Sequence, residues 1–292
     1  MGFLRLCVFL FLATACGEKK EPPSKMTIVT TYSILADIIS HITEGSGIEV
    51  KTLVPRLSDP HTYEPKPEDF VLLSHANLIF AHGLRFEGWF ERILGTHKEC
   101  VTFVAAPHPT RILDDGSIDP HTWHDPTLMK MSIPLIVEKL SINFPAYAGL
   151  FHSNAENYIK NLEDLDMEIA SLFKNLPTST KRIVLTTHDS FYYFGKRYGI
   201  EFIAPLGITT DAEPKAQTLS KIIERIKKEG IRAIFIENLS NQHSLHQISK
   251  ETGIDINGIL YADSLSEEKG PAATYIEMLR YNATAIRNAL VG

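Results

Sequence analysis

A long amphipathic segment in the middle of the chain constrains the fold more than any other feature. Between Pro145 and Pro177, apolar residues recur in alternating steps of four and three: Phe151, Ala155, Tyr158, Leu162, Leu165, Ile169, Leu172 and Leu176. This spacing keeps one face of an α-helix apolar, and a proline marks each end. It predicts a helix over 146–176, about 45 Å long at 1.5 Å per residue. A dimeric coiled coil is the alternative, but about four heptads favour a rigid strut that packs along two lobes.

The segments on either side of this helix resemble each other. An apolar run at 27–32 contains Thr-Thr before a helical stretch, as does the run at 182–188, and a further strand at 78–83 has a counterpart at 233–238. Short β-branched runs that alternate with helical stretches predict βα units and a parallel sheet. We therefore expect an α/β fold of two similar lobes, each a small, mostly parallel sheet flanked by helices, joined by one long rigid helix.

The N-terminal segment has the pattern of an export signal. A short apolar run ends in small residues before Cys16, and it is too short to span a bilayer as a helix of about 20 residues. The polar, proline-containing stretch that follows resembles a bacterial lipoprotein signal, in which Cys16 becomes the acylated first residue; a plain secretory signal cleaved near Cys16 is the alternative. The expected organisation is a signal peptide at 1–15, a lipid-anchored tether at 16–25, an N-terminal lobe at 26–145, the long helix at 146–176 and a C-terminal lobe at 177–292.

Charge and cysteine content exclude two classes of protein. The 292 residues hold 29 Lys and Arg against 35 Asp and Glu, a formal net charge of −6. A mildly acidic chain without basic clusters argues against nucleic acid as a partner. Of the three cysteines, one lies within the signal and one at its end, so no disulfide framework is expected.

The tetrapeptide Asp-Pro-His-Thr occurs twice, at 59–62 and 119–122. Proline fixes its own backbone angle and lacks an amide donor, so each Asp-Pro predicts a loop that presents the next imidazole rigidly. Because neutral imidazole is the commonest protein metal ligand, the pattern suggests a metal site. Two unrelated surface turns are the alternative.

Donor side chains follow four of the predicted strands. His61 and His121 come after the second and fourth strands of the first half, and His188 and Asp263 come after the first and fourth strands of the second half. In open α/β sheets, functional groups gather beyond the carboxyl ends of the strands. The four side chains therefore converge if the lobes face each other. Three imidazoles and one carboxylate suit a tetrahedral site, above all for zinc.

Five motifs make a family resemblance specific: DPHTYEP at 59–65, DPHTWHDP at 119–126, TTHDSFYYF at 186–194, GITTDAEP at 207–214 and YADSL at 261–265. In this order, and together with the long helix, they resemble the metal-binding solute-binding lipoproteins of ABC importers, the periplasmic zinc-uptake family, which take up zinc or manganese. The resemblance runs from Met26 to Val291. It implies two α/β lobes that hold the ion between them through one residue of each of four motifs: His61, His121, His188 and Asp263.

The resemblance also implies a function. We expect an exported monomer, periplasmic or at the cell surface and anchored through lipid on Cys16, that captures a divalent ion and delivers it to the transmembrane permease of an ABC importer. Relatives selective for manganese carry Glu where His188 stands. Because imidazole suits zinc and carboxylate suits manganese, the ligand set favours Zn²⁺, with Mn²⁺ as the alternative cargo.

Two other classes of function are alternatives to metal capture. A zinc-dependent hydrolase would keep an open coordination position and use Asp263 as a base. The lack of an HExxH run and the closed four-ligand set argue against an enzyme. The remaining alternative is a surface adhesin, since an anchored, exported protein faces other molecules.

Four of the histidines outside the expected ligand set have motif positions or spacing that could bear on metal binding. For His124, three residues after His121, a solvated or core-edge position is favoured over a fifth ligand. His82 is interpreted as an ordinary residue at the end of a strand, with a polar role near the cleft as the alternative. His243 and His246 have helical spacing, which predicts a solvated helix face rather than an accessory metal site.

Overall fold

The computed structural model describes residues 26–95, 101–105 and 111–292. The predicted signal peptide at 1–15 and tether at 16–25, including Cys16, lie outside these ranges. Within them, every helix is too short or too polar to cross a bilayer.

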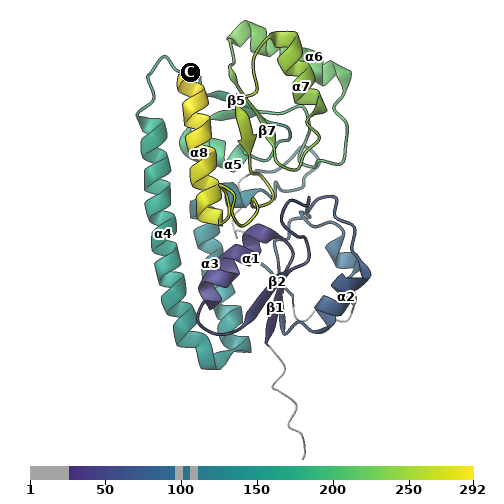
Figure 1. Cartoon of the computed structure of the whole chain (residues 1–292), viewed down its shortest axis with the longest axis vertical. Coiled ribbons are helices and arrows are strands. Elements are labelled where there is room, and N and C mark those ends of the chain that lie inside the picture. The colour runs from purple at the N-terminus through teal and green to yellow at the C-terminus, as the bar shows by residue number, and fades with distance from the viewer. Residues whose placement is uncertain (1–25, 96–100, 106–110) are drawn as a thin grey trace, which may run out of the picture.

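Two four-stranded parallel sheets form the centres of two lobes (Figure 1). The first sheet has the order β2 (Glu49–Thr52), β1 (Thr27–Thr30), β3 (Leu78–Ala81) and β4 (Val101–Phe103). The second has the order β6 (Glu201–Ile203), β5 (Ile183–Leu185), β7 (Ala233–Glu237) and β8 (Gly258–Leu260). All six ladders between these strands are parallel. The identical order confirms the predicted α/β class and the likeness of the two lobes.

Helices cover both faces of each sheet. They are α1 (Ser33–Thr43), α2 (Pro67–Ser74), α3 (Pro126–Asn143), α4 (Ala148–Lys174), α5 (Tyr192–Tyr198), α6 (Ala216–Glu229), α7 (His243–Thr252) and α8 (Tyr275–Val291), with short 3₁₀ turns η1 (Phe90–Arg92), η3 (Thr122–His124) and η4 (Pro145–Tyr147). Alternation along the strands explains the layers, because successive side chains of a strand point to opposite faces. Ile28 and Phe80 join the core on the side of α1 and α4, whereas Val29 and Ile79 join a smaller core on the other side.

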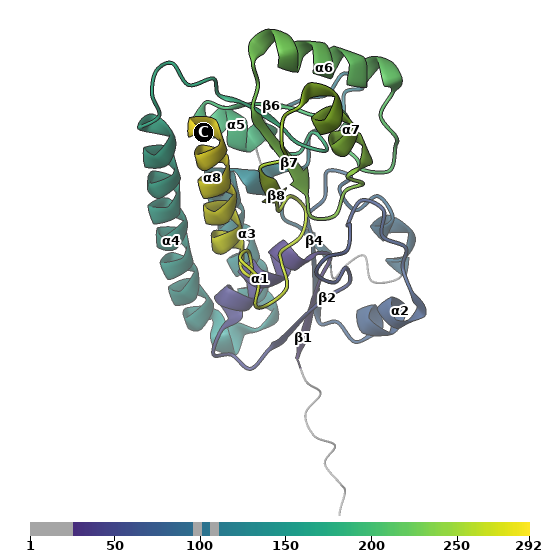
Figure 2. The ribbon, with the colours of Figure 1, turned by 45° about the horizontal axis from the view of Figure 1, so that its top comes forward.

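The predicted long helix is α4. Its buried residues include Phe151, Tyr158, Leu165 and Ile169, as the spacing predicted. In the last turn Phe173 is buried, and Leu172 only partly. Helix α4 packs against α1 and α3 from the first half of the chain and against α8 from the end of the second half. Figures 1 and 2 both show α4 extending along both lobes, with α8 beside its C-terminal part.

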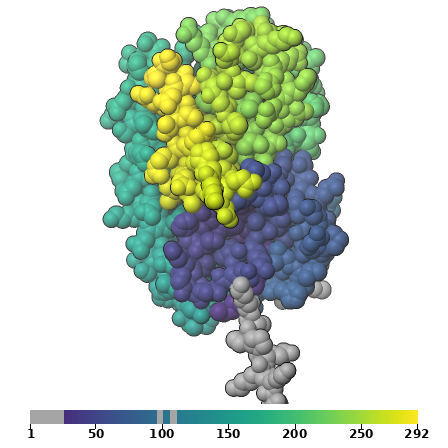
Figure 3. Space-filling model, viewed as in Figure 1, coloured from purple at the N-terminus to yellow at the C-terminus, as the bar shows by residue number. Residues whose placement is uncertain are grey.

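The lobes share their largest hydrophobic core, and each lobe also has a smaller core of its own. One cluster of buried side chains extends from Ile28 in β1 to Ile286 in α8. Figure 3 shows the C-terminal segment, in yellow, lying directly on the N-terminal part of the chain, in purple. Hydrogen bonds cross this seam, from the Tyr275 N–H to Asp37 Oδ2 at 2.9 Å and from the Leu265 N–H to Ser33 Oγ at 3.0 Å. The two lobes are therefore held in a fixed relation to each other.

Candidate metal centre

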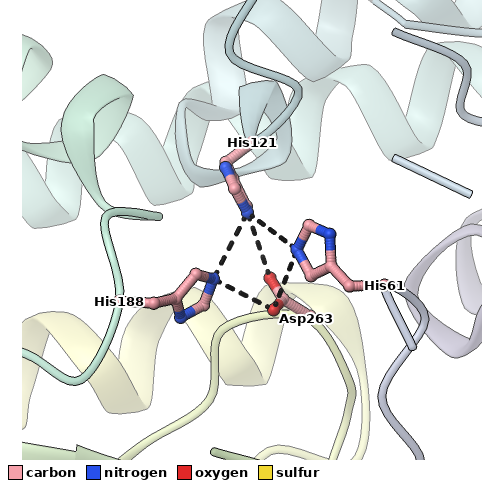
Figure 4. A group of neighbouring side chains, drawn as sticks. All are labelled: His61, His121, His188 and Asp263. Atoms are coloured by element: carbon pink, nitrogen blue, oxygen red, sulfur yellow. Dashed lines mark hydrogen bonds and ion pairs between the residues drawn. The ribbon is translucent and has the colours of Figure 1, made fainter. Parts of the chain in front are cut away.

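The structure brings together the four side chains expected from the sequence. His61 follows β2, His121 lies just before η3, His188 follows β5 and Asp263 follows β8. One donor atom from each lies within 4.8 Å of the others (Figure 4). The His121 and His188 side chains are 0% exposed, and those of His61 and Asp263 are 3% exposed. The site is thus a buried group of three imidazoles and one carboxylate between the lobes.

The spacing of the donor atoms suits a tetrahedral ion. His121 Nε2 lies 3.3 Å from His61 Nε2 and 3.4 Å from His188 Nε2. Two nitrogens that each bind zinc at about 2.0–2.1 Å with a tetrahedral angle lie about 3.3 Å apart. Asp263 Oδ2 lies 3.2 Å from His188 Nε2 and 3.6 Å from His61 Nε2. Asp263 Oδ1 is buried and has no hydrogen-bond donor among the described residues, which leaves its lone pairs for a cation.

Both Asp-Pro-His-Thr segments form the same turn. The Asp59 carboxylate accepts the His61 backbone N–H at 2.8 Å, and the Asp119 carboxylate accepts the His121 backbone N–H at 3.0 Å. Such Asx turns fix the loop that carries the imidazole. Asp119 also accepts from His121 Nδ1 at 2.8 Å, so in the neutral ring Nε2 is left as the donor to a metal. Asp59 accepts instead from the Thr210 hydroxyl of the other lobe.

Glu237, at the end of β7, orients His188. Its Oε2 accepts from His188 Nδ1, and its Oε1 accepts the backbone N–H groups of Thr187 and His188 at 3.0 and 3.1 Å. Burial disfavours a charged His188, but the carboxylates of Glu237 and Asp263 outweigh burial and raise the His188 pKa well above its usual value. A proton on His188 therefore competes with an incoming cation.

His61 and Asp263 show opposite electrostatic effects. Burial lowers the pKa of His61 to about 3, which keeps this imidazole neutral and ready to bind a metal. Burial would raise the pKa of Asp263, but the charge and hydrogen bond of His188 outweigh it and hold that pKa below its usual range. The carboxylate therefore stays ionised at neutral pH, and it supplies the negative charge that a divalent cation requires.

Comparison with known proteins places the chain in a family. The family described as "Zinc-uptake complex component A periplasmic" matches residues 28–289. The chain belongs to this family. Among relatives of this zinc-uptake family member, the manganese-binding lipoprotein MntA of Halalkalibacterium halodurans is 27% identical over 291 residues, covering 98% of this chain and 96% of the relative. The manganese ABC transporter substrate-binding lipoprotein PsaA of Streptococcus pneumoniae is 29% identical over 296 residues, covering 96% and 95%.

Solved structures agree with the family assignment. The periplasmic zinc-binding protein TroA from Treponema pallidum superposes on the zinc-uptake family member with a TM-score of 0.86 at 27% identity, covering 91% of this chain and 99% of TroA. A manganese-bound periplasmic metal-binding protein from Candidatus Liberibacter asiaticus gives a TM-score of 0.81 at 25% identity, covering 91% of this chain and all of that one. The resemblance inferred from the five motifs is thus confirmed.

Arg111 connects the two lobes beside the site of the family member. Its guanidinium donates to Asp119 at 3.1 Å and to Asp189, the residue after His188, at 2.9 Å. It also lies 4.5 Å from the centre of the Tyr192 ring. Asp119 orients His121, so the group Arg111, Asp119 and Asp189, here called the cross-lobe clasp, links the surroundings of two expected ligands. Arg111 and His61 line one groove of about 600 Å³, so this expected ligand borders the groove.

Two of the further histidines differ from their sequence interpretation. His124 is neither solvated nor at the edge of the core: it is fully buried, and its ring packs at a tilt against that of Phe191, with the centroids 4.3 Å apart. Burial lowers its pKa to about 3, and neither ring nitrogen has a hydrogen-bond partner among the described residues. His82 is also fully buried, and both of its ring nitrogens make polar contacts, so it is not an ordinary strand-end residue. His243 and His246 are exposed on α7, as predicted.

Sequence reasoning missed the groups that orient the ligands. Glu237 lay in a recognised strand, and its signal was a carboxylate directly after four apolar residues. A buried charge at the end of a strand calls for a partner, which here is His188. Arg111 carried no signal of this kind, because its two acceptors are 8 and 78 positions away in the sequence.

Proposed function

We propose that this chain captures one divalent transition-metal ion between its lobes, Zn²⁺ in preference to Mn²⁺, and delivers it to the transmembrane permease of an ABC importer. The observation that carries the proposal is the convergence of three imidazole nitrogens and one carboxylate at tetrahedral spacing. His61, His121 and His188 supply nitrogen donors, which bind the ion once the ring is neutral, and Asp263 supplies charge. Nitrogen-rich sites of this kind suit zinc, whereas manganese prefers oxygen donors.

The geometry supports capture rather than catalysis. A catalytic zinc site keeps three protein ligands and leaves a fourth position for water or substrate. Here Asp263 lies within 3.7 Å of a nitrogen of each of the three imidazoles, which is the position of a fourth ligand rather than of a base beside an open site. The proposed role is therefore transport without an enzymatic step. The family and the relatives named as ABC transporter substrate-binding lipoproteins support the same role.

Metal titration tests this function. Protein stripped of metal is titrated with Zn²⁺ and with Mn²⁺ in competition with a chelator of known affinity, and elemental analysis gives the stoichiometry. We expect one ion per chain, tighter binding of Zn²⁺ than of Mn²⁺, and a loss of at least a hundredfold in affinity in His121→Ala. His243→Ala, which removes an exposed histidine of α7, is the matched control and should bind like the wild type. Unchanged affinity in His121→Ala would exclude the site, and tighter Mn²⁺ binding would reverse the choice of cargo.

We propose that the protein acts as an exported monomer held at the membrane by lipid on Cys16. Support comes from the short apolar segment before Cys16 and from relatives named as lipoproteins. Labelling of bacteria that express the chain with a radioactive fatty acid should mark the wild type and leave Cys16→Ser unlabelled. Sedimentation of residues 26–292 should give the mass of a single chain. Equal labelling of the two proteins, or a dimer mass, would contradict the respective proposal.

A further inference from the structure

The strand register shows that Tyr32 and His82 occupy the places in the first lobe that His188 and Glu237 occupy in the second. In β1 and β3, Val29 pairs with Ile79; in β5 and β7, Leu185 pairs with Ile234. Tyr32 comes three residues after Val29, and His188 comes three residues after Leu185. His82 comes three residues after Ile79, and Glu237 comes three residues after Ile234. The two lobes therefore present one side-chain pair at equivalent positions.

Each pair is joined by a hydrogen bond, but the two pairs serve different purposes. In the second lobe, Glu237 holds the ring of an expected ligand directly. In the first lobe, the Tyr32 hydroxyl lies 3.2 Å from His82 Nδ1, and His82 Nε2 lies 2.6 Å from the carbonyl oxygen of Pro120. Because a carbonyl oxygen can only accept, His82 Nε2 carries the proton, and in the neutral ring Nδ1 accepts from Tyr32.

His82 thereby holds the backbone on both sides of an expected ligand. Pro120 precedes His121, and the hydroxyl of Thr122, which follows it, lies 3.4 Å from the same His82 Nε2. The His82 ring is fully buried and packs edge-on against Phe86 and Trp123, with centroid separations of 5.6 and 4.8 Å. The ring is thus fixed by packing, while its two nitrogens connect Tyr32, between β1 and α1, to the loop that presents His121.

We infer that His82 is a positioning residue for the metal site, acting through the Pro120 carbonyl to fix the loop of His121. Asp119 sets the orientation of the His121 ring, and His82 sets the position of its backbone. The His121 nitrogen stays at tetrahedral spacing only if both the ring orientation and the backbone position are fixed, because a displaced donor lengthens one metal bond and lowers the metal affinity. This inference rests on the proposed metal-binding function.

Two substitutions of His82, by side chains of similar length, separate the effect of its hydrogen bonds from the effect of its packing. In His82→Gln, the amide nitrogen reaches about where imidazole Nε2 lies and can donate to Pro120. His82→Met fills a similar volume and cannot donate, so the Pro120 carbonyl and the Tyr32 hydroxyl both lose their partner. Zn²⁺ affinity is measured by chelator competition, the dissociation rate by a chelator chase, and the thermal midpoint of the metal-free protein reports folding. Tyr32→Phe, which removes only the hydroxyl, is a further variant that keeps the ring.

The pattern across the variants decides the inference. We expect His82→Gln to stay within about threefold of the wild-type affinity, and His82→Met to bind about tenfold or more weakly and to release Zn²⁺ faster. Tyr32→Phe should lie between them. Wild-type affinity in His82→Met, or equal losses in the Met and Gln variants, would overturn the inference. If neither His82 variant folds, wild-type affinity in Tyr32→Phe overturns it. A wild-type protein that binds no Zn²⁺ refutes the proposed function instead.

Discussion

Replacing Glu237 with glutamine should weaken Zn²⁺ binding although it changes hardly any volume. The carboxylate accepts three N–H groups: His188 Nδ1 on one oxygen, and the backbone N–H groups of Thr187 and His188 on the other. A glutamine offers one carbonyl oxygen and one NH₂ group, so either His188 Nδ1 or the two backbone N–H groups must face the NH₂ donor. Each of the two amide orientations therefore carries a cost.

The size of the effect follows from these two orientations. If the NH₂ group faces His188, Nδ1 must become an acceptor and the ring proton moves to Nε2, the atom that binds the ion. If the NH₂ group faces the backbone, two buried N–H donors lose their acceptor, at about 1–3 kcal/mol each. The protein adopts the cheaper orientation. We expect a 10- to 100-fold loss of Zn²⁺ affinity, or about 1.4–2.8 kcal/mol, as is typical when the partner of a ligating histidine is lost.

The chain provides a matched control for this substitution. Glu87 is also a buried carboxylate at the edge of a sheet, and it accepts the Thr31 hydroxyl and the backbone N–H groups of His82 and Gly83. It contacts none of the four expected ligands and holds only the backbone of His82, so Glu87→Gln should weaken Zn²⁺ binding less than Glu237→Gln does. Both variants are titrated with Zn²⁺ by calorimetry after their metal-free thermal midpoints are compared. Binding by Glu237→Gln within threefold of the wild type would refute the reasoning.

Three further results are expected. The raised pKa of His188 keeps a proton on this ring, and zinc binds only the neutral ring. Zn²⁺ affinity should therefore rise by about tenfold per pH unit below that pKa. Chelator competition from pH 5.5 to 8 measures this, and a flat profile would contradict it. Gly195→Ala should lower the free energy of unfolding by about 1–3 kcal/mol, because the added Cβ would lie 2.4 Å from the Ile200 carbonyl oxygen. Gly149→Ala, whose added Cβ would have no neighbour within 4 Å, should not lower it; urea denaturation measures both. Arg111→Met breaks the cross-lobe clasp and should speed Zn²⁺ release by about tenfold in a stopped-flow chase, whereas wild-type release would show that the clasp does not restrain the site.

Periodicity and strand order made much of the fold predictable. The apolar positions of α4, such as Phe151 and Ile169, repeat every three or four residues because one helix face must be buried. The four donors were found because the carboxyl ends of parallel strands meet at one edge of a sheet, where His188 and Asp263 each follow a short apolar strand. These are local patterns that need no knowledge of distant contacts.

The surroundings of the site could not be predicted because they depend on contacts between distant segments. The sequence predicts a solvated or core-edge position for His124, but its ring packs against Phe191 of the other lobe. His82 looked like a strand end, and its acceptor, the Pro120 carbonyl, lies 38 positions later. Contacts with backbone carbonyls and with distant aromatic rings leave no signature in the order of residues, so such partners are found only in the folded chain.

The shared core along α4 has a kinetic consequence for the bound ion. Separating the lobes as rigid bodies would expose part of a core that runs from β1 to α8, which costs far more than opening a single loop. The ion should therefore leave by local unfolding of a ligand loop, and the loop of His61 borders the solvent groove. Its escape rate should then follow the opening of that loop, which hydrogen exchange of the loop amides reports. It should depend only weakly on denaturant, since the opening exposes little surface. A permease that loosened this one loop could empty the site while the rest of the protein stayed folded.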